Sequence, residues 1–120
     1  MGKVNTYRDL KIWGKSMNMV THIYHLTREF PNNEQFGQTS QIRRSAVSIP
    51  SNIAEGFGRQ TQKEFAYFLR ISISSLFELQ TQLEICKNVE IFKKEKFDFI
   101  YDTSREVERM LSSFIRTLKK

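Results

Sequence analysis

Two histidines and one cysteine are the residues whose types could bind a metal or carry catalysis. His22 and His25 lie one helical turn apart and Glu29 follows one turn later, so the three could share one face of a helix. A metal would need more ligands, and the sequence lacks the paired Glu-x-x-His pattern of metal sites in helical bundles. Cys86 falls on the apolar seam of a predicted helix, which favours a buried structural thiol. We therefore expect no enzymatic activity, no cofactor and no bound metal.

A polar face between about residues 39 and 59 is the most unusual feature of the sequence. Its members recur at spacings of four and three, opposite an apolar stripe: Gln41, Ser45, Ser48, Asn52, Glu55 and Arg59. Hydroxyl, amide and guanidinium groups are common contacts to phosphates and bases. The same face could instead form a polar layer between helices or subunits, in which Glu55 pairs with Arg59. Both interpretations stay open.

The net charge of +6, with a pI of about 9.6, indicates nucleic acid as a partner or simply a solvated basic surface. The candidate nucleic-acid-binding residues flank the polar face or lie on the first predicted helix: Arg43, Arg44, Arg59, Lys63, Lys11 and Lys15. We expect phosphate contacts with little readout of bases, because the sequence shows no aromatic stacking platform of the kind that recognises RNA bases.

Four helices must position these residues. Apolar residues recur at spacings of three and four over residues of about 9–29, 39–57, 61–87 and 93–118. Thr61 and Glu64 form a capping box at the start of the third helix, and Pro50 predicts a kink or a restart within the second. Short connections favour antiparallel neighbours. The predicted fold is therefore all-α, an antiparallel up-down-up-down four-helix bundle that forms one domain over residues 1–120.

Several classes of protein are excluded by composition. No apolar stretch approaches the roughly 20 residues of a membrane span, and residues 1–10 lack the apolar core of a secretory signal. A single cysteine excludes an internal disulfide. We expect a cytoplasmic protein with no membrane partner. The wide apolar stripes of the first and third helices also favour contact with a second subunit.

The second predicted helix carries a stretch with a family resemblance. Residues 41–56 read QIRRSAVSIPSNIAEG, which resembles the signature of a bacterial four-helix bundle family named for open reading frames in the intervening sequences of 23S ribosomal RNA genes. The similarity extends over about residues 7–87. Its signature positions are Ser48, Pro50, Asn52, Glu55 and Gly56. We interpret Pro50 as setting a kink, Gly56 as allowing close approach or ending the helix, and Asn52 and Glu55 as members of a hydrogen-bond network between helices or subunits.

The resemblance implies a ring-like homopentamer. It also implies kinship with the accessory variability proteins of diversity-generating retroelements, which are basic pentameric barrels that bind nucleic acid and a reverse transcriptase. The first hypothesis is a non-enzymatic homo-oligomer that binds structured RNA or DNA through basic patches. The alternative is an oligomeric scaffold that docks a partner protein, such as a reverse transcriptase, without binding nucleic acid. An enzyme built on Glu55, or on His22 and His25, is a third hypothesis.

Overall fold

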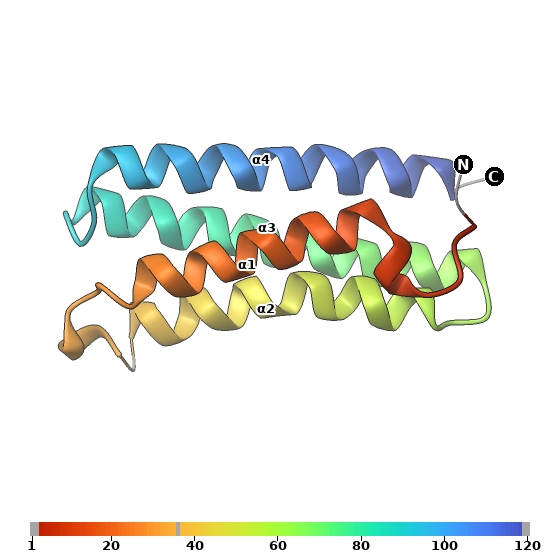
Figure 1. The fold of residues 1–120 in the computed structure, drawn as a ribbon, viewed down its shortest axis with the longest axis horizontal. Coiled ribbons are helices and arrows are strands. Elements are labelled where there is room, and N and C mark those ends of the chain that lie inside the picture. The colour runs from red at the N-terminus through yellow and green to blue at the C-terminus, as the bar shows by residue number, and fades with distance from the viewer. Residues whose placement is uncertain (1–2, 36, 119–120) are drawn as a thin grey trace.

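Four long helices make up the protein, which a computed structural model describes over residues 3–35 and 37–118. They are α1 (Lys11–Thr27), α2 (Gln38–Phe57), α3 (Gln62–Asn88) and α4 (Lys94–Thr117), with short 3-10 turns η1 (Tyr7–Asp9) and η2 (Asn32–Glu34). Figure 1 shows the four helices running lengthwise and alternating in direction, in a body of 45 × 25 × 21 Å. The prediction of an all-α up-down-up-down bundle is confirmed, and each helix begins and ends within two residues of its expected bounds.

Each helix packs on its two neighbours around the bundle. α2 and α3 share the most extensive contact, and α1 closes the square against α4 with the least extensive one. The largest fully buried side chains come from all four helices: Met19, Ile23, Ile42, Ile49, Ile53, Leu69, Leu76, Leu79, Leu83, Ile100, Val107 and Leu111. They are the residues that the three-and-four spacing places on one face of each helix. Across the two described ranges, none of the helices combines the length and apolarity that crossing a membrane requires.

A capping residue determines where α3 begins, whereas the proline within α2 does not interrupt that helix. The Thr61 hydroxyl accepts a hydrogen bond from the backbone N–H of Glu64 (3.1 Å), which caps α3 as the sequence predicts. α2 runs through Pro50 without a break, so the helix does not restart there. Ile49 and Ile53 are completely buried on either side of Pro50. Their burial holds the helix together although proline removes one backbone hydrogen bond.

Candidate nucleic-acid interface

The polar face of α2 turns mostly toward α3. The Ser45 hydroxyl donates to the side-chain oxygen of Gln82 (3.0 Å), and the hydroxyls of Ser48 and Ser75 lie 2.8 Å apart. The amide of Asn52 donates to the carbonyl oxygen (2.8 Å) and hydroxyl (3.0 Å) of Ser48. Of the two interpretations that the sequence leaves open, these contacts favour a polar layer between helices.

The same polar layer includes buried residues of α3. The Ser72 hydroxyl donates to the carbonyl of Ile49 (2.9 Å), and the amide of Gln82 donates to the side-chain oxygen of Gln41 (3.5 Å). Among the described residues, every fully buried side-chain nitrogen and oxygen has a hydrogen-bond partner. The small hydroxyl and amide groups of α2 therefore bind each other and α3, because a buried polar group without a partner is costly.

The two adjacent arginines of α2 have different environments. Arg43 is half-buried, and its Nε donates to the Thr27 hydroxyl (2.8 Å) while its guanidinium lies 4.5 Å from the centre of the Tyr24 ring. Its Nη2 also donates to the carbonyl of Tyr24 (3.4 Å), near the C-terminal end of α1. Arg44 is exposed, and no ion pair joins it to a carboxylate within the described ranges. Arg43 thus links α1 to α2, whereas Arg44 is available to a ligand.

The other four candidate residues divide in the same way. Lys15 pairs with Glu106 across the α1–α4 contact (3.1 Å), and Arg59 pairs with Glu55 (2.8 Å). The Arg59 guanidinium also lies 4.7 Å from the centre of the Phe68 ring. Lys11 and Lys63 are exposed without an ion pair to any described residue. Half of the candidate set is therefore engaged within the subunit.

The six candidate residues do not form one patch. Arg43 and Arg44 lie in the first two turns of α2, while Arg59 follows its last turn. At a rise of 1.5 Å per residue, fifteen residues separate Arg44 and Arg59 by about 22 Å along the helix axis. Lys63 begins α3 and Lys11 begins α1, so these two join Arg59 at one end of the bundle. The chain thus places a basic cluster at that end, apart from Arg44.

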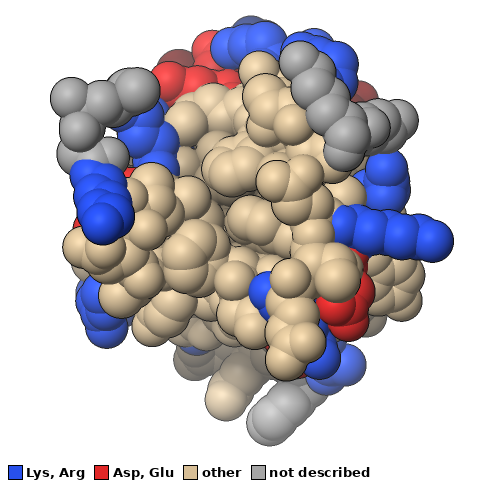
Figure 2. Space-filling view, turned by 90° about the vertical axis from the view of Figure 1, so that its right-hand side faces the viewer, with Lys and Arg blue, Asp and Glu red and all other residues tan. Residues whose placement is uncertain are grey.

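The end of the bundle with these three residues is rich in basic groups. Figure 2 looks onto it and shows lysine and arginine side chains around the rim of an uncharged centre. Residues 3–12, 55–65 and 113–118 meet there, and we call their basic members the basic end: Lys3, Arg8, Lys11, Arg59, Lys63 and Arg116. Sequence reasoning missed Lys3, Arg8 and Arg116 as members. The topology could have found them, because antiparallel helices bring alternate termini together.

Local contacts occupy all three carboxylates of those segments. Asp9 accepts hydrogen bonds from the backbone N–H groups of Asn5 (2.9 Å) and Thr6 (3.1 Å), which lower the pKa of its carboxyl group. Glu64 accepts from the Thr61 hydroxyl (3.1 Å), and Glu55 pairs with Arg59. Lys11, Lys63 and Arg116 remain exposed, with no ion pair to the described residues. This end therefore presents net positive charge to solvent.

The three residues considered for metal binding, His22, His25 and Glu29, each contact a different partner. The His22 ring packs edge-on against Phe99, and His25 lies 3.3 Å from the Arg28 guanidinium. Glu29 accepts a 2.8 Å hydrogen bond from Lys96, which lowers the pKa of its carboxyl group. Within residues 3–35 and 37–118, no three His, Cys, Asp or Glu side chains converge as a metal site would require.

Burial also governs the chemistry of the cysteine. The Cys86 side chain is completely buried, and its burial raises the pKa of the thiol to about 11, with a smaller contribution from the charge of Glu34. A nucleophilic cysteine needs the opposite shift, since the thiolate is the reactive form. Cys86 therefore acts as a small apolar core residue.

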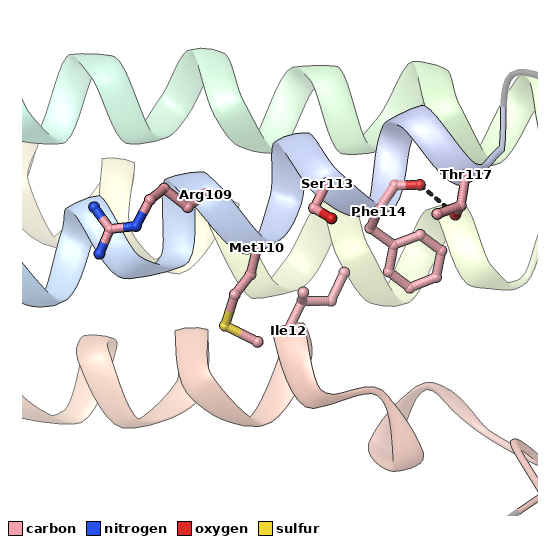
Figure 3. A pocket seen from close by; sticks show the side chains of 6 residues that line it. All are labelled: Ile12, Arg109, Met110, Ser113, Phe114 and Thr117. Carbon is pink, nitrogen blue, oxygen red and sulfur yellow. Dashed lines mark hydrogen bonds between the residues drawn. The ribbon is translucent and has the colours of Figure 1, made fainter.

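A shallow apolar groove lies between α1 and α4. Figure 3 shows Ile12, Met110 and Phe114 gathered there, while the Arg109 side chain extends away from them. Ser113 and Thr117 complete the lining, and the groove has a volume of about 460 Å³. The Thr117 hydroxyl donates a hydrogen bond to the backbone carbonyl of Phe114 (2.6 Å). Among the described residues, those that line the groove include no carboxylate, histidine or thiol to move a proton. The groove therefore offers apolar surface, not a catalytic constellation.

Comparison with protein families matches residues 8–113 to the family described as 23S rRNA-intervening sequence protein. The chain belongs to this family. A similar solved structure is that of a protein of unknown function from the S23 ribosomal protein family of Bacteroides thetaiotaomicron. It is 28% identical, with a TM-score of 0.82 over 88% of this chain and 95% of that one. A comparison with curated proteins finds no match.

Three of the five signature positions, Ser48, Asn52 and Gly56, lie at the contact between α2 and α3. Ser48 and Asn52 belong to the polar layer, and Pro50 is buried. Glu55 is exposed and pairs with Arg59, so within the subunit it lies outside the hydrogen-bond network expected for it. A Cβ on Gly56 would lie 2.7 Å from the Cβ of Phe68, and α2 continues beyond it. Gly56 therefore allows close approach and does not end the helix.

Proposed function

We propose that this protein is a non-enzymatic homo-oligomer that binds structured RNA or another nucleic acid through the basic end. The observation that carries the proposal is the charge of that end. Its segments hold six basic and three acidic residues, and all three carboxylates are engaged in caps or in the Glu55–Arg59 pair. Exposed lysine and arginine side chains without local partners are the groups that neutralise phosphates.

The geometry favours contacts to the phosphate backbone. Lys11, Lys63 and Arg116 come from three different helices, α1, α3 and α4, at the same end of the bundle, so they can follow a curved or folded strand. Recognition of single-stranded bases needs exposed aromatic platforms. The aromatic residues of these segments (Tyr7, Phe57, Phe65 and Phe114) are each partly buried against the core. Binding is therefore expected to depend on shape and salt more than on sequence.

Oligomerisation would multiply this weak, charge-driven contact. Several large apolar side chains stay exposed on the isolated subunit, including Met17, Val47, Tyr67, Phe77 and Ile85. Exposed apolar surface of this kind is typical of subunit contacts. In a ring, here proposed to be a pentamer, the basic ends of all copies would repeat around one axis. Linked copies bind more tightly than one copy alone, because later contacts form at high effective concentration.

The test measures mass and binding together. Native mass spectrometry of protein purified at low salt without nuclease should detect an oligomer carrying nucleic acid that high salt removes. Fluorescence anisotropy with a labelled RNA hairpin should then show that Lys11→Ala with Lys63→Ala weakens binding. The slope of log affinity against log salt should fall by about one for each phosphate that the variant no longer neutralises.

The matched control removes the same charge from the opposite end of the bundle. Arg28→Ala with Lys93→Ala alters two basic residues that lie far from the basic end, so RNA affinity should stay close to that of the wild type. Equal loss of binding in both double variants would mean that overall charge, not the basic end, carries the affinity. An oligomer that binds neither RNA nor DNA at low salt would reject nucleic-acid binding and favour the protein scaffold.

A further inference from the structure

The apolar groove between α1 and α4 is continuous with the basic end. Its apolar floor consists of Ile12, Met110 and Phe114 (Figure 3). Ile12 belongs to residues 3–12 and Phe114 to residues 113–118, two of the segments that meet at the basic end. The volume of about 460 Å³ lies within the range of small-molecule sites, about 300–1,000 Å³. A strand bound at the basic end would therefore pass beside apolar surface large enough to cover a small flat group.

An ion pair bounds the groove on the side away from the basic end. The Lys15 ammonium lies 3.1 Å from the Glu106 carboxylate and joins α1 to α4. Lys15 follows Ile12 by one helical turn, and Glu106 precedes Met110 by one turn, so the pair lies just beyond the floor. The groove is therefore short, and its free end lies at the basic end.

Two arginines of α4 lie at opposite ends of the groove. Arg109, Ser113 and Arg116 follow one another at spacings of four and three, so they share one side of the helix. At 1.5 Å per residue, the two arginines are about 10 Å apart along the axis. Both are exposed, and neither forms an ion pair within the described ranges, because the neighbouring Glu108 pairs with Arg105 (3.1 Å). The groove thus offers an apolar floor between two available guanidinium groups.

The α4 side of the groove also carries two exposed hydroxyls. The Thr117 hydroxyl donates its proton to the carbonyl of Phe114 (2.6 Å), so it can only accept a hydrogen bond from a ligand. The Ser113 hydroxyl lines the groove one turn earlier and can donate or accept. A ligand with an apolar face and polar edges is therefore matched on both its surfaces.

We infer that the α1–α4 groove receives one unpaired base of a nucleic-acid strand bound at the basic end. The inference rests on the nucleic-acid binding in the proposed function and names what is recognised: a bulged, looped or terminal nucleotide. The face of the base would cover the apolar floor, and its edge would meet the hydroxyls of Ser113 and Thr117. The phosphates on its two sides would lie within reach of Arg109 and Arg116.

The form of the groove also determines what it does not recognise. A fully paired helix keeps its bases stacked inside the duplex, so only an unpaired nucleotide can turn outward into the groove. Phe114 is partly buried and presents part of its ring, unlike the aromatic platforms that stack successive bases. The groove therefore selects for one unpaired base without selecting which base it is.

The test changes the base while it keeps every phosphate. Fluorescence anisotropy compares two labelled RNA hairpins, one with a single bulged uridine and one with an abasic nucleotide at the same position. Because both hairpins carry the same charge, the ratio of their affinities isolates the contact to the base. The wild type should bind the uridine hairpin about tenfold more tightly, the order of effect expected for the contact of one base.

A neutral variant assigns the contact to this groove. Met110→Ala shortens the floor without changing charge, so the affinity ratio should fall toward one while the affinity for the abasic hairpin stays unchanged. Met17→Ala is the matched control, since it removes a methionine that is 39% exposed outside this groove, and it should keep the tenfold ratio.

A crosslink gives a second readout that needs no variant. With 4-thiouridine as the bulged nucleotide, ultraviolet light should join the RNA to the wild-type protein. After trypsin digestion, mass spectrometry should find the crosslink on the peptide of residues 110–116, which trypsin releases by cutting after Arg109 and Arg116.

The outcomes separate this inference from the proposed function. If the wild type binds neither hairpin at low salt, nucleic-acid binding fails and the base site fails with it. If the two hairpins bind equally well, or if 4-thiouridine crosslinks only outside residues 110–116, nucleic-acid binding stands and the base site is overturned. Equal loss of the ratio in Met110→Ala and Met17→Ala would overturn the assignment to this groove.

Discussion

Gly56 on α2 faces Phe68 on α3 with no space for a side chain between them. A Cβ at Gly56 would lie 2.7 Å from the Cβ of Phe68 and 2.9 Å from Cδ1 of Phe65. Phe65 in turn packs edge-on against Phe57 and Phe114, so its ring is not free to withdraw from a new methyl group. The glycine of the family signature thus sets the distance between two helices at the basic end.

Gly56→Ala should destabilise the bundle even though alanine favours helix. Alanine gains about 1 kcal/mol over glycine within a helix, but overpacking a tight contact costs about 1–3 kcal/mol. The matched control is Gly14→Ala in α1, where a Cβ would meet nothing within 4 Å. Urea unfolding followed by circular dichroism should show lower stability for Gly56→Ala and higher stability for Gly14→Ala. Stabilisation by both changes would contradict the close contact.

Ser45→Ala should cost more stability than its small size suggests. The substitution leaves the buried Gln82 oxygen without the hydroxyl that now donates to it at 3.0 Å, at a cost of about 1–3 kcal/mol. Adding Gln82→Leu should restore much of the loss, because the polar group without a partner is then gone. A double-mutant cycle in urea measures the coupling. Simple additivity of the two changes would mean that this hydrogen bond does not matter.

Arg43 and Arg44 should differ in how much each contributes to the stability of the bundle. Arg43→Ala removes the hydrogen bond to Thr27 and the stacking on Tyr24, so its melting temperature should fall. Arg43→Lys should recover only part of the loss, since an ammonium cannot replace the planar guanidinium. Arg44→Ala should leave the melting temperature within error of the wild type. A larger fall in melting temperature for Arg44→Ala than for Arg43→Ala would contradict this prediction.

The Cys86 thiol should be unreactive in the folded protein. Burial raises its pKa from 9.0 to about 11, so the thiolate is scarcer in the folded state than in the unfolded one. Alkylation by iodoacetamide at pH 8 should therefore be slow until urea unfolds the chain. The raised pKa also contributes stability that is fully present below pH 9 and lost as the pH rises toward 11. That part of the alkaline decline should be absent in Cys86→Ala.

Periodicity in the sequence predicts the helices well, because burial of one side of a helix requires apolar residues at spacings of three and four. Ile42, Ile49 and Ile53 repeat at helical spacing, and all three are completely buried. The polar face of α2 was equally visible, and pairing of Glu55 with Arg59 followed from their spacing of four. What the spacing could not decide was whether that face meets solvent or α3.

The sequence could not predict which residues pair with the basic side chains. Arg43 and Arg44 are adjacent, but only the direction of each side chain in the folded bundle gives Arg43 a partner on α1. Lys15 pairs with Glu106 from the far end of the chain, a contact that no local pattern contains. The basic end is similar, since its members come from three separate segments that only the topology brings together.

The short link between α2 and α3 has a consequence for the order of folding. Only four residues, 58–61, join the two helices that share the most extensive contact. Pairs that are close in sequence close their loops at low entropic cost, so α2 and α3 should associate first and their amide hydrogens should exchange most slowly. α1 and α4 each pack less extensively on their neighbours than α2 and α3 pack on each other. The middle of the chain would then act as the template on which both terminal helices dock, so their amide hydrogens should exchange faster than those of α2 and α3.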